Sequence, residues 1–450
     1  MKLTLLLFFS VFYALAQNIS GKILEMETNK PIEFVNVYLE KEEGGTISNK
    51  KGEFYLELLS KIKLTDTIHF SFIGYTTRYY TFSKLKELNF IVHLSKKIEN
   101  LDQVTVTSIR ELKSKMPYRK LASLKNGIYN FGSALIGNKL YVIGGDTSFI
   151  EDTAKKTFIE VSSIAESTFK DFLKRSRSNF SWENFNGKLQ TYDIEKDTWS
   201  ISNLKFRKRA YHQIIYLNNK VYVLGGKRLS TNRKREYLDD KIEVFSLKTN
   251  QIIIDNVNPH QAINFAAFAY QDNIIVMGGS IKLKNNGEKI YSDKTHIYNI
   301  TSGYWFELPK MTEPKEANGV IIKNKVYLIG GFNKIPLTGI ESYNLTNGKW
   351  NKEGDLFSGI VTPALTYYNN IIYIFSNGKI LTYNIVTKVL NEYKIDLYVK
   401  NSQMYCYQDN LYILGGYKED EYTKSSSSRL NLIKLNDFSK TKIINSKKLN

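Results

Sequence analysis

The chain has 450 residues, 42% hydrophobic and 13% aromatic, which is enough for one large folded domain and one small one. Its formal net charge is +19, yet it contains no run of five or more basic residues and no nucleic-acid-binding motif. We therefore expect scattered surface lysines and no nucleic-acid partner. The 31 Tyr and 25 Phe favour strands, because aromatic side chains suit pleated, half-buried surfaces.

Residues 1–16 have the features of a secretory signal peptide. Lys2 supplies a positive start, an apolar run follows, and Ala14-Leu15-Ala16 is a small-x-small cleavage sequence. Gln17 stands where a lipoprotein has Cys, and no later apolar stretch is long enough to span a bilayer. We expect an exported protein without a transmembrane segment. A periplasmic location is favoured, with the cell surface or secretion as alternatives and outer-membrane association only through partners.

Residues 17–107 have the pattern of a small β-sandwich. Short apolar runs at 34–39 and 70–73 alternate with turn residues at Gly44-Gly45, Asn49 and Gly52. This spacing of short strands and turns is typical of small all-β domains.

Four pieces of this region resemble the carboxypeptidase regulatory-like (transthyretin-like) domain. They are Ile19-Ser20-Gly21-Lys22-Ile23, Lys30-Pro31-Ile32-Glu33-Phe34-Val35-Asn36-Val37, Gly45-Thr46-Ile47-Ser48-Asn49-Lys50-Lys51-Gly52-Glu53-Phe54 and Phe72-Ile73-Gly74-Tyr75. Residues 101–107 resemble the segment that closes this domain in exported proteins of the Bacteroidetes. The family's domain often precedes an outer-membrane receptor barrel, which is absent here, so the resemblance implies a structural or docking module. Residues 108–118 are predicted to be a linker.

From residue 119 to 450 the sequence repeats an apolar strand that ends in Gly-Gly. The copies end at Gly144-Gly145, Gly225-Gly226, Gly278-Gly279, Gly330-Gly331 and Gly415-Gly416, with a degenerate copy at Ser376-Asn377. Apart from the first gap, the spacing brackets a period of about 50 residues. A second landmark is an aromatic pair seven residues apart: Tyr192 with Trp199, Tyr298 with Trp305, and Tyr343 with Trp350. Phe245 with Ile252 and Tyr383 with Leu390 occupy the same positions, which predicts a strand, a tight turn and a return strand.

The order strand, Gly-Gly, Tyr, six residues, Trp resembles the kelch repeat, over about three quarters of the chain. The resemblance implies a six-bladed β-propeller in which each four-stranded blade buries its faces against its neighbours. The predicted fold class is therefore all-β, a small β-sandwich followed by a six-bladed kelch-type propeller. Residues 442–445 are expected to supply the outer strand of the last blade, with no strand borrowed from the N-terminal side.

The first gap in the repeat exceeds the period by roughly 30 residues. This places an insertion at 147–188, between the second and third strands of blade one. Ile164, Phe169, Phe172 and Leu173 lie near helical spacing, which predicts a short amphipathic helix over 163–175. Such loops lie on one rim of a propeller and shape its mouth, although an insertion without a function is an open alternative.

The candidate ligand-binding residues are basic side chains in two classes of loop that share one face of a propeller. One class leads into the first strand of a blade, and the other follows a Gly-Gly pair. The candidates are Arg119, Arg207, Arg209, His212 and Arg228. Arg suits carboxylate or phosphate groups through bidentate contacts, so the expected partner is a glycan or protein ligand with an anionic group. Simple solvation of exposed loops is the competing interpretation.

No catalytic residue, metal site or cofactor is predicted. The histidines lack metal-ligand spacing, and Cys406 lies in an apolar stretch with no nearby His, which favours a buried structural thiol. The pattern that copper radical oxidases resembling galactose oxidase require is likewise missing.

One enzymatic relative remains an alternative: the exported six-bladed sialic-acid mutarotases, which imply a carbohydrate-active enzyme of the mutarotase or epimerase type. Glu313 and Glu316, in the loop leading into blade four, are the carboxylates that could assist acid–base chemistry. No motif specific to those enzymes occurs. The preferred hypothesis is an exported binding protein whose propeller recognises a glycan or protein and whose β-sandwich is a docking module.

Overall fold

The computed structural model describes residues 17–40, 45–58, 61–97, 111–176, 181–233, 235–283 and 288–449. The chain divides into two compact units, Met1–Arg110 and Glu111–Asn450. The predicted signal peptide and the segment 101–107 lie outside the described residues. In the described part of the chain, no helix is both long and apolar enough to cross a membrane.

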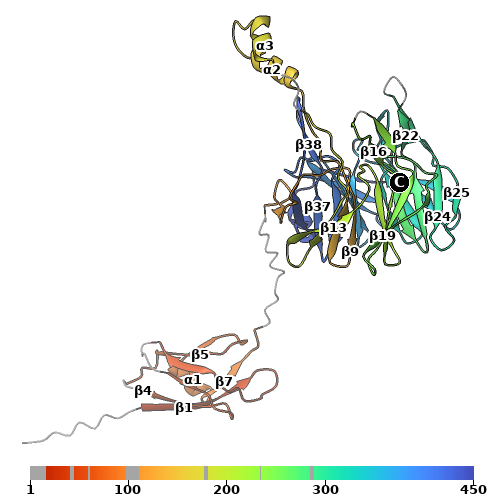
Figure 1. The fold of residues 1–450 in the computed structure, drawn as a ribbon. Coiled ribbons are helices and arrows are strands. Elements are labelled where there is room, and N and C mark those ends of the chain that lie inside the picture. Colours follow the sequence, from red (N-terminus) through yellow and green to blue (C-terminus); the bar gives the residue numbers. More distant parts are fainter. Residues whose placement is uncertain are drawn as a thin grey trace, which may run out of the picture. The chain divides into compact units, whose positions relative to one another are not determined.

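The N-terminal unit is a sandwich of two sheets (Figure 1). Its elements are β1 (Gln17–Glu25), β2 (Asn36–Leu39), β3 (Gly45–Ile47), β4 (Glu53–Leu58), β5 (Thr67–Ser71), β6 (Arg78–Thr81), α1 (Phe82–Glu87) and β7 (Ile91–Leu94). One sheet has the order β4-β1-β7 and the other β3-β2-β5-β6. Buried residues alternate with exposed or partly buried ones along β4 and β5, and Ile23, Phe54 and Phe70 are fully buried between the sheets. The predicted β-sandwich is confirmed.

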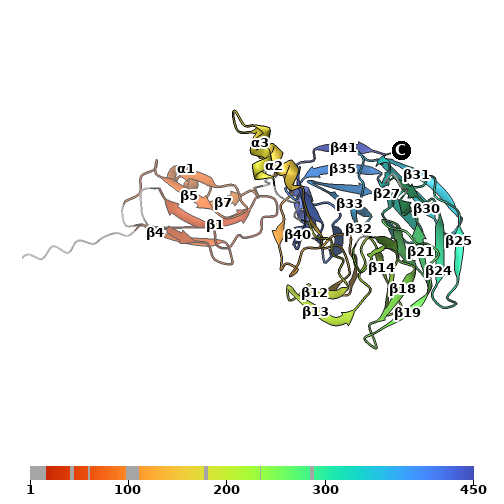
Figure 2. The same cartoon turned by 45° about the horizontal axis from the view of Figure 1, so that its top comes forward.

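The second unit is a propeller of antiparallel sheets placed around a central axis (Figure 2). Its first four blades each have four strands in chain order, from the inside outward. They are β9 (Gly132–Ile136), β10 (Lys139–Ile143), β12 (Lys188–Asp193) and β13 (Thr198–Lys205); β14 (Gln213–Leu217), β15 (Lys220–Leu224), β18 (Lys241–Ser246) and β19 (Gln251–Val257); β20 (Ala266–Tyr270), β21 (Asn273–Met277), β24 (Thr295–Asn299) and β25 (Trp305–Leu308); and β26 (Gly319–Ile322), β27 (Lys325–Ile329), β30 (Gly339–Asn344) and β31 (Lys349–Asp355).

Two further sheets complete the series within the described residues, and both recruit a strand from elsewhere in the chain. Blade five contains β32 (Ala364–Tyr368), β33 (Ile371–Ser376), β34 (Lys379–Asn384), β35 (Val389–Lys394) and a fifth strand, β41 (Asn445–Lys448). Blade six contains β36 (Gln403–Tyr407), β37 (Asn410–Leu414), β40 (Leu430–Lys434) and, on its outer edge, β8 (Arg119–Lys120).

This arrangement corrects the expectation that the last blade carries its own outer strand at 442–445. The outer strand of blade six is β8, which comes from the N-terminal side of the propeller and pairs with β40. A short 3-10 helix, η1 (Leu435–Lys440), follows β40, and the chain then leaves blade six and pairs β41 with β35 of blade five. Joining the two ends of the propeller segment through backbone hydrogen bonds leaves fewer unpaired strand edges in the ring.

Residues 111–118, which fall within the predicted linker, lie against the propeller. The side chain of Met116 is buried, and its backbone N–H donates to the carbonyl of Lys394 at 2.7 Å. Lys113 pairs with Thr441 in an isolated bridge. This segment therefore leads directly into β8.

The Gly-Gly pairs follow the second strand of their blades, and both glycines of the five full pairs have positive φ. A Cβ atom on Gly225 would lie 2.4 Å from the ring of Phe265, which precedes the first strand of the next blade. Glycine is required here by the backbone conformation and by the close approach of the neighbouring blade.

The aromatic pairs lie directly opposite each other on adjacent strands. Tyr192 faces Trp199 with ring centroids 5.1 Å apart, and the two other Tyr–Trp pairs are separated by 4.9 and 4.8 Å. Phe245 with Ile252 and Tyr383 with Leu390 hold the same register. The predicted hairpins are confirmed, and these residues contribute to the packing between blades.

The insertion lies between β10 and β12, as predicted, and contains β11 (Phe149–Glu151), α2 (Thr153–Ser162) and α3 (Phe169–Arg175). The short helix expected within 163–175 is confirmed over Phe169–Arg175, whereas the preceding helix α2 was not predicted. The side chain of Asp152 caps one helix and Thr168 caps a second, in a capping box with Asp171. These caps divide the segment into two short helices.

The two loop classes share one face of the propeller, as expected. In five blades, the loop that leads into the first strand forms an isolated bridge with the segment that follows the Gly-Gly pair. The bridges are Tyr129–Asp146, Ala210–Lys227, Ile263–Ser280, Glu316–Phe332 and Lys400–Tyr417. Hairpins extend from this face (Figure 1): β16 (Lys227–Leu229) with β17 (Glu236–Leu238), β22 (Ser280–Leu283) with β23 (Lys289–Tyr291), β28 (Phe332–Asn333) with β29 (Ile335–Pro336), and β38 (Tyr417–Glu419) with β39 (Thr423–Ser426). We call this face the hairpin rim.

Candidate functional site

The central channel opens on the hairpin rim and is lined by the residues that precede the first strand of each blade. The six residues two positions before those strands are Asn130, Tyr211, Asn264, Ala317, Thr362 and Asn401. Four of them have φ between 49° and 62°, a left-handed conformation that Asn adopts more readily than most residues. The left-handed backbone conformation at this position therefore recurs in four of the blades.

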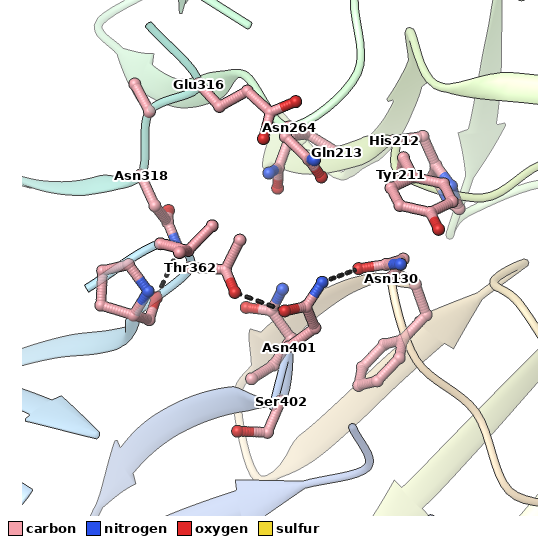
Figure 3. A pocket seen from close by; sticks show the side chains of 15 residues that line it. Asn130, Tyr211, His212, Gln213, Asn264, Glu316, Asn318, Thr362, Asn401 and Ser402 are labelled. Carbon is pink, nitrogen blue, oxygen red and sulfur yellow. Dashed lines mark hydrogen bonds between the residues drawn. The ribbon is translucent and has the colours of Figure 1, made fainter. Parts of the chain in front are cut away.

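Side chains across the channel are hydrogen-bonded to each other (Figure 3). Asn401 donates through Nδ2 to Oδ1 of Asn130 at 2.6 Å, and Thr362 donates to Oδ1 of Asn401. Asn318 donates through Nδ2 to the carbonyl of Pro363 at 2.7 Å. The remaining cavity has a volume of about 50 Å³. It has room for one or a few water molecules but not for a sugar ring.

His212, one of the predicted candidates, lies on the wall of this channel and is buried. Its Nε2 is 3.0 Å from the carbonyl oxygen of Ile143 and 3.2 Å from the backbone nitrogen of Gly132, both in blade one. Burial, together with the charge of Arg209, lowers the pKa of His212 to about 3. The ring is therefore neutral at physiological pH and connects two blades.

Three of the predicted arginines converge on the acidic residues of blade two. Arg209 is fully buried, and its Nη2 lies 2.8 Å from Glu243 Oε2 and 3.2 Å from Asp239 Oδ2. Arg207 and Arg228 also contact Asp239, at 3.1 and 3.3 Å. Nη1 of Arg209 donates to the backbone carbonyls of Gly225 and Lys241. The ion pairs and hydrogen bonds of the Arg209 side chain thus lie within blade two.

The position of Arg209 recurs in blade four. Arg209 and Lys315 each stand four residues before the first strand of their blade, and both side chains are buried. Their acidic partners, Glu243 and Glu341, occupy the same register position on the third strand. A buried cation paired with a carboxylate is thus a repeated packing element.

Arg119 is separated from the other candidates along the fold. It lies on β8, the outer strand of blade six, and its side chain is exposed. The structure therefore brings together Arg207, Arg209 and Arg228 but leaves Arg119 on the outer edge of the ring.

A lysine–tyrosine cluster at the mouth of the channel is absent from the sequence-based candidates. Lys424 on β39 places its Nζ 4.2 Å from the ring centroid of Tyr417 and 4.7 Å from that of Tyr129. The two rings are 5.1 Å apart. Beside them, Lys227 lies over the ring of Tyr211, 4.6 Å from its centroid. We call these five residues the mouth cluster.

The mouth cluster combines cations with neutral phenols. Burial lowers the pKa of Lys424, whereas it raises the pKa of Tyr417 to about 12 and also raises those of Tyr129 and Tyr211. Lys227 forms an ion pair with Glu236, but no ion pair to Lys424 occurs among the described residues. Lys424 is therefore held by cation–π contacts without a direct ion pair, while the carboxylates of Asp146 and Glu419 favour its charged form from beyond ion-pair distance.

The repeat contains a partial signal for this cluster. Lys227 and Tyr417 each come directly after a Gly-Gly pair, and Tyr129 and Tyr211 lie in loops leading into first strands. Aligning the repeats would therefore have placed these residues near one another. Lys424 has no such signal, because it lies on the return strand of a hairpin whose length varies from blade to blade.

A cleft of about 450 Å³ lies on the same rim, between the hairpins of blades two and three. Its lining includes Tyr237, Ile281, Lys282, Lys289 and Lys227, which also belongs to the mouth cluster. Tyr237 and Ile281 are 48% and 41% exposed, so an apolar surface is available to a partner. The cleft is within the size range of pockets that hold small molecules or single side chains of a protein.

The two glutamates considered for catalysis lie next to lysines of the protein, and the single cysteine is partly buried. Glu316 is buried at the channel wall, where it forms an ion pair with Lys289 at 2.6 Å, and Glu313 lies 3.5 Å from Lys315. Burial raises the pKa of the Cys406 thiol to about 11, so that it is protonated at neutral pH. Among the described residues, no group of three or more His, Cys, Asp or Glu side chains could hold a metal ion.

Comparison with family models assigns the two units separately. A model of the CarboxypepD_reg-like domain matches residues 19–106, and a model of the Attractin/LZTR1 beta-propeller matches residues 179–341. The first match spans the β-sandwich, and the second runs from the end of the insertion in blade one into blade four.

Curated relatives contain kelch repeats. The Kelch repeat and BTB domain-containing protein 1 of Horsepox virus is 27% identical over 260 residues, which are 53% of this chain and 43% of that protein. The Kelch domain-containing protein 10 of Rattus norvegicus is 26% identical over 195 residues, 42% of this chain and 38% of that protein. The chain therefore spans less than half the length of these relatives.

A solved structure titled "Structure of YjhT" superposes with a TM-score of 0.52 at 12% sequence identity, covering 68% of this chain and 95% of that one. At this identity the likeness concerns the fold alone. The matched models, the repeated blades and this superposition agree: the chain combines a carboxypeptidase regulatory-like domain with a kelch-type β-propeller, a fold that supports a protein-interaction or binding role.

Proposed function

We propose that the protein is an exported interaction protein whose propeller binds an acidic segment of a partner protein at the mouth cluster. The observation that carries this proposal is Lys424, which two tyrosine rings hold at the mouth of the channel without a direct ion pair among the described residues. A carboxylate that reaches this ammonium group gains a charge-assisted contact in a partly buried site.

The channel itself is too small to be the binding site. Its free volume is about 50 Å³, and the side chains around it already form hydrogen bonds with each other and with a backbone carbonyl. A ligand must therefore bind above the channel, on the hairpin rim. There the mouth cluster and the cleft between blades two and three form a continuous surface through Lys227.

The surface chemistry favours a protein over a glycan as the partner. The rim offers exposed apolar side chains such as Tyr237 and Ile281 beside the lysines. A bound protein would cover these side chains, and apolar residues that are buried on binding and surrounded by polar groups are typical of protein interfaces. The matched kelch proteins support the same choice. An acidic glycan would use the same cations, so it is an explicit outcome of the test.

The β-sandwich is proposed to be a docking module that holds the propeller at its site of action. Tyr38, His69 and Tyr79 form a row of rings across three strands of one sheet, with centroids 4.8 and 4.7 Å apart. Tyr38 and Tyr79 are substantially exposed, so this outer face offers an aromatic surface to a second partner. The signal-peptide pattern of residues 1–16 supports the proposal of export, with the periplasm as the favoured location and the cell surface or secretion as alternatives.

The binding proposal is tested by selecting peptides from a random displayed library on the full mature chain. We expect peptides rich in Asp and Glu, whose affinity falls about tenfold on Lys424→Met and decreases steeply with salt. Lys418→Met is the matched control, because Lys418 is an exposed residue on the same hairpin without a ring contact. Recovered peptides that are neutral and indifferent to Lys424→Met would overturn the proposal. Binding of uronic-acid oligosaccharides without any peptide binding would replace the protein partner with a glycan.

The alternative activity, mutarotation of a sialic acid, has a separate test. Proton NMR of the free sugar measures how quickly its anomers exchange. On our proposal, the rate is unchanged at high protein concentration. An accelerated exchange that is lost on Glu316→Gln would favour the enzyme.

A further inference from the structure

The insertion of blade one forms a helical hairpin that projects away from the propeller (Figure 1). Strand β11 pairs with β39 of blade six, and Phe149 stacks on Trp182 with centroids 5.2 Å apart at the base of the hairpin. Helices α2 and α3 follow on this stem. Their capping residues, Asp152 and Thr168, hold the two helix starts. Strand pairing, ring stacking and helix caps therefore fix the conformation of the helical hairpin.

This surface has an aromatic face that nothing in the described chain covers. Phe158, Phe169 and Leu173 are 62%, 72% and 57% exposed. The ring of Phe172 connects the two helices, because it lies 6.3 Å from that of Phe158 and 5.7 Å from that of Phe169. Contiguous exposed apolar residues of this kind mark a contact surface for another molecule or for a membrane.

The same two helices also carry exposed basic side chains. Lys155, Lys170, Lys174 and Arg175 are all exposed. Residues 153–176 contain five basic and three acidic side chains, and one of those acids, Asp171, is bonded to Thr168 in the capping box. The hairpin thus combines aromatic side chains with an excess of positive charge.

We propose that this helical hairpin binds the surface of an anionic lipid bilayer, with Phe158, Phe169 and Leu173 inserted at the level of the headgroups. Short helices with aromatic and basic residues suit such a position, since their apolar side chains enter the interface while Lys and Arg contact lipid phosphates. The charge excess favours this occupant over a second copy of the basic chain, which would bring like charges together.

The stem gives this contact a consequence for the rest of the molecule. Strand β39 pairs with β11 and also carries Lys424 of the mouth cluster. If the helical hairpin of α2 and α3 binds a membrane, the hairpin rim of the propeller therefore faces the lipid surface. A partner bound at the rim would then be one that is itself held at that membrane.

The test is co-sedimentation of the full mature chain with vesicles of phosphatidylglycerol and phosphatidylcholine in equal parts. We expect binding to these vesicles and much weaker binding to phosphatidylcholine alone. The double variant Phe158→Ser with Phe169→Ser should lose most of the binding. Lys170→Gln and Lys174→Gln should each weaken it by about fivefold, the effect of removing one charge near an anionic surface.

Matched controls separate the hairpin from general stickiness of a basic protein. Phe306→Ser removes another exposed Phe, from the outer strand of blade three, and Lys196→Gln removes an exposed charge from a turn in blade one. Both should bind vesicles like the wild type. Thermal unfolding checks that the variants remain folded.

Either of two results with the mixed vesicles would overturn the proposal: the absence of binding, or binding that the double Phe variant leaves unchanged. If lipid binding is absent and the chain forms a concentration-dependent dimer that the double Phe variant abolishes, the aromatic face belongs to a second copy of the chain.

Discussion

Two basic clusters of the propeller show how differently positive charge is used in one fold. In blade two, Arg209 is fully buried against Glu243 and Asp239, so its charge is compensated within the protein. At the channel mouth, Lys424 lies on two tyrosine rings and has no ion pair among the described residues. The distance to the acidic neighbours decides the difference. Arg209 contacts its carboxylates directly, whereas Asp146 and Glu419 act on Lys424 from beyond ion-pair distance, so that a ligand carboxylate can contact its ammonium group.

The largest effect is expected from Arg209→Met, which would leave the buried carboxylate of Glu243 without its ion pair and remove one of the three arginines that contact Asp239. Removing one member of a buried ion pair costs about 3–5 kcal/mol of the free energy of unfolding. Urea denaturation of the full chain measures this loss. An unchanged midpoint would show that the Arg209 cluster is not a stabilising element and would remove the contrast with Lys424.

The second effect concerns pH and His212. The pKa of this buried ring is lowered to about 3 in the folded protein, whereas an unfolded His titrates near 6.5. The unfolded chain therefore binds the proton first, and the stability contributed by the neutral ring is present above pH 6.5 and lost as the pH falls toward 3. The slope is about 1.4 kcal/mol per pH unit within this window. Unfolding curves of the wild type and His212→Gln should differ in that slope, and equal slopes would place the histidine in a solvated site.

A smaller effect is expected from Lys424→Met, and it should appear in binding rather than in stability. We expect the free energy of unfolding to change by less than about 1 kcal/mol, because the apolar side chain can still lie on the two rings. The affinity for an acidic peptide should fall roughly tenfold. Paired measurements of urea unfolding and peptide binding would separate Lys424 from Arg209. A large loss of stability at Lys424 would contradict the distinction.

The smallest effect is expected from Arg119→Met. The side chain is exposed on the outer strand of blade six, away from the mouth cluster, so stability should change by less than about 0.5 kcal/mol and peptide affinity should be unaffected. A clear loss of affinity would extend the binding surface to the outer edge of the ring.

Much of the fold was predictable because it is carried by repeated local patterns. The glycine pairs need positive φ, and the aromatic pairs need a tight hairpin, so both constraints appear in the sequence near the residues that they govern. The closure of the ring was not predictable in this way. Strand β8 has only two residues, and its partner β40 lies more than 300 residues away, so no local pattern marks the pairing.

The candidate site was predicted only in part. The sequence correctly indicated that two loop classes share a face, but it could not show that Arg207, Arg209 and Arg228 would meet Asp239 there. Asp239 follows the hairpin of blade two, whose length is not repeated in other blades. Lys424 was missed for the same reason.

By itself, the sequence determined the all-β class, the order of the two units and the repeat that builds the blades, because period and turn chemistry are local properties. Only the tertiary structure decided which cations form direct ion pairs and which do not. Charge compensation depends on distances of a few ångströms between side chains far apart in the chain. For this protein, that distinction moves the search for a ligand from the arginines of blade two to the lysines and tyrosines at the channel mouth.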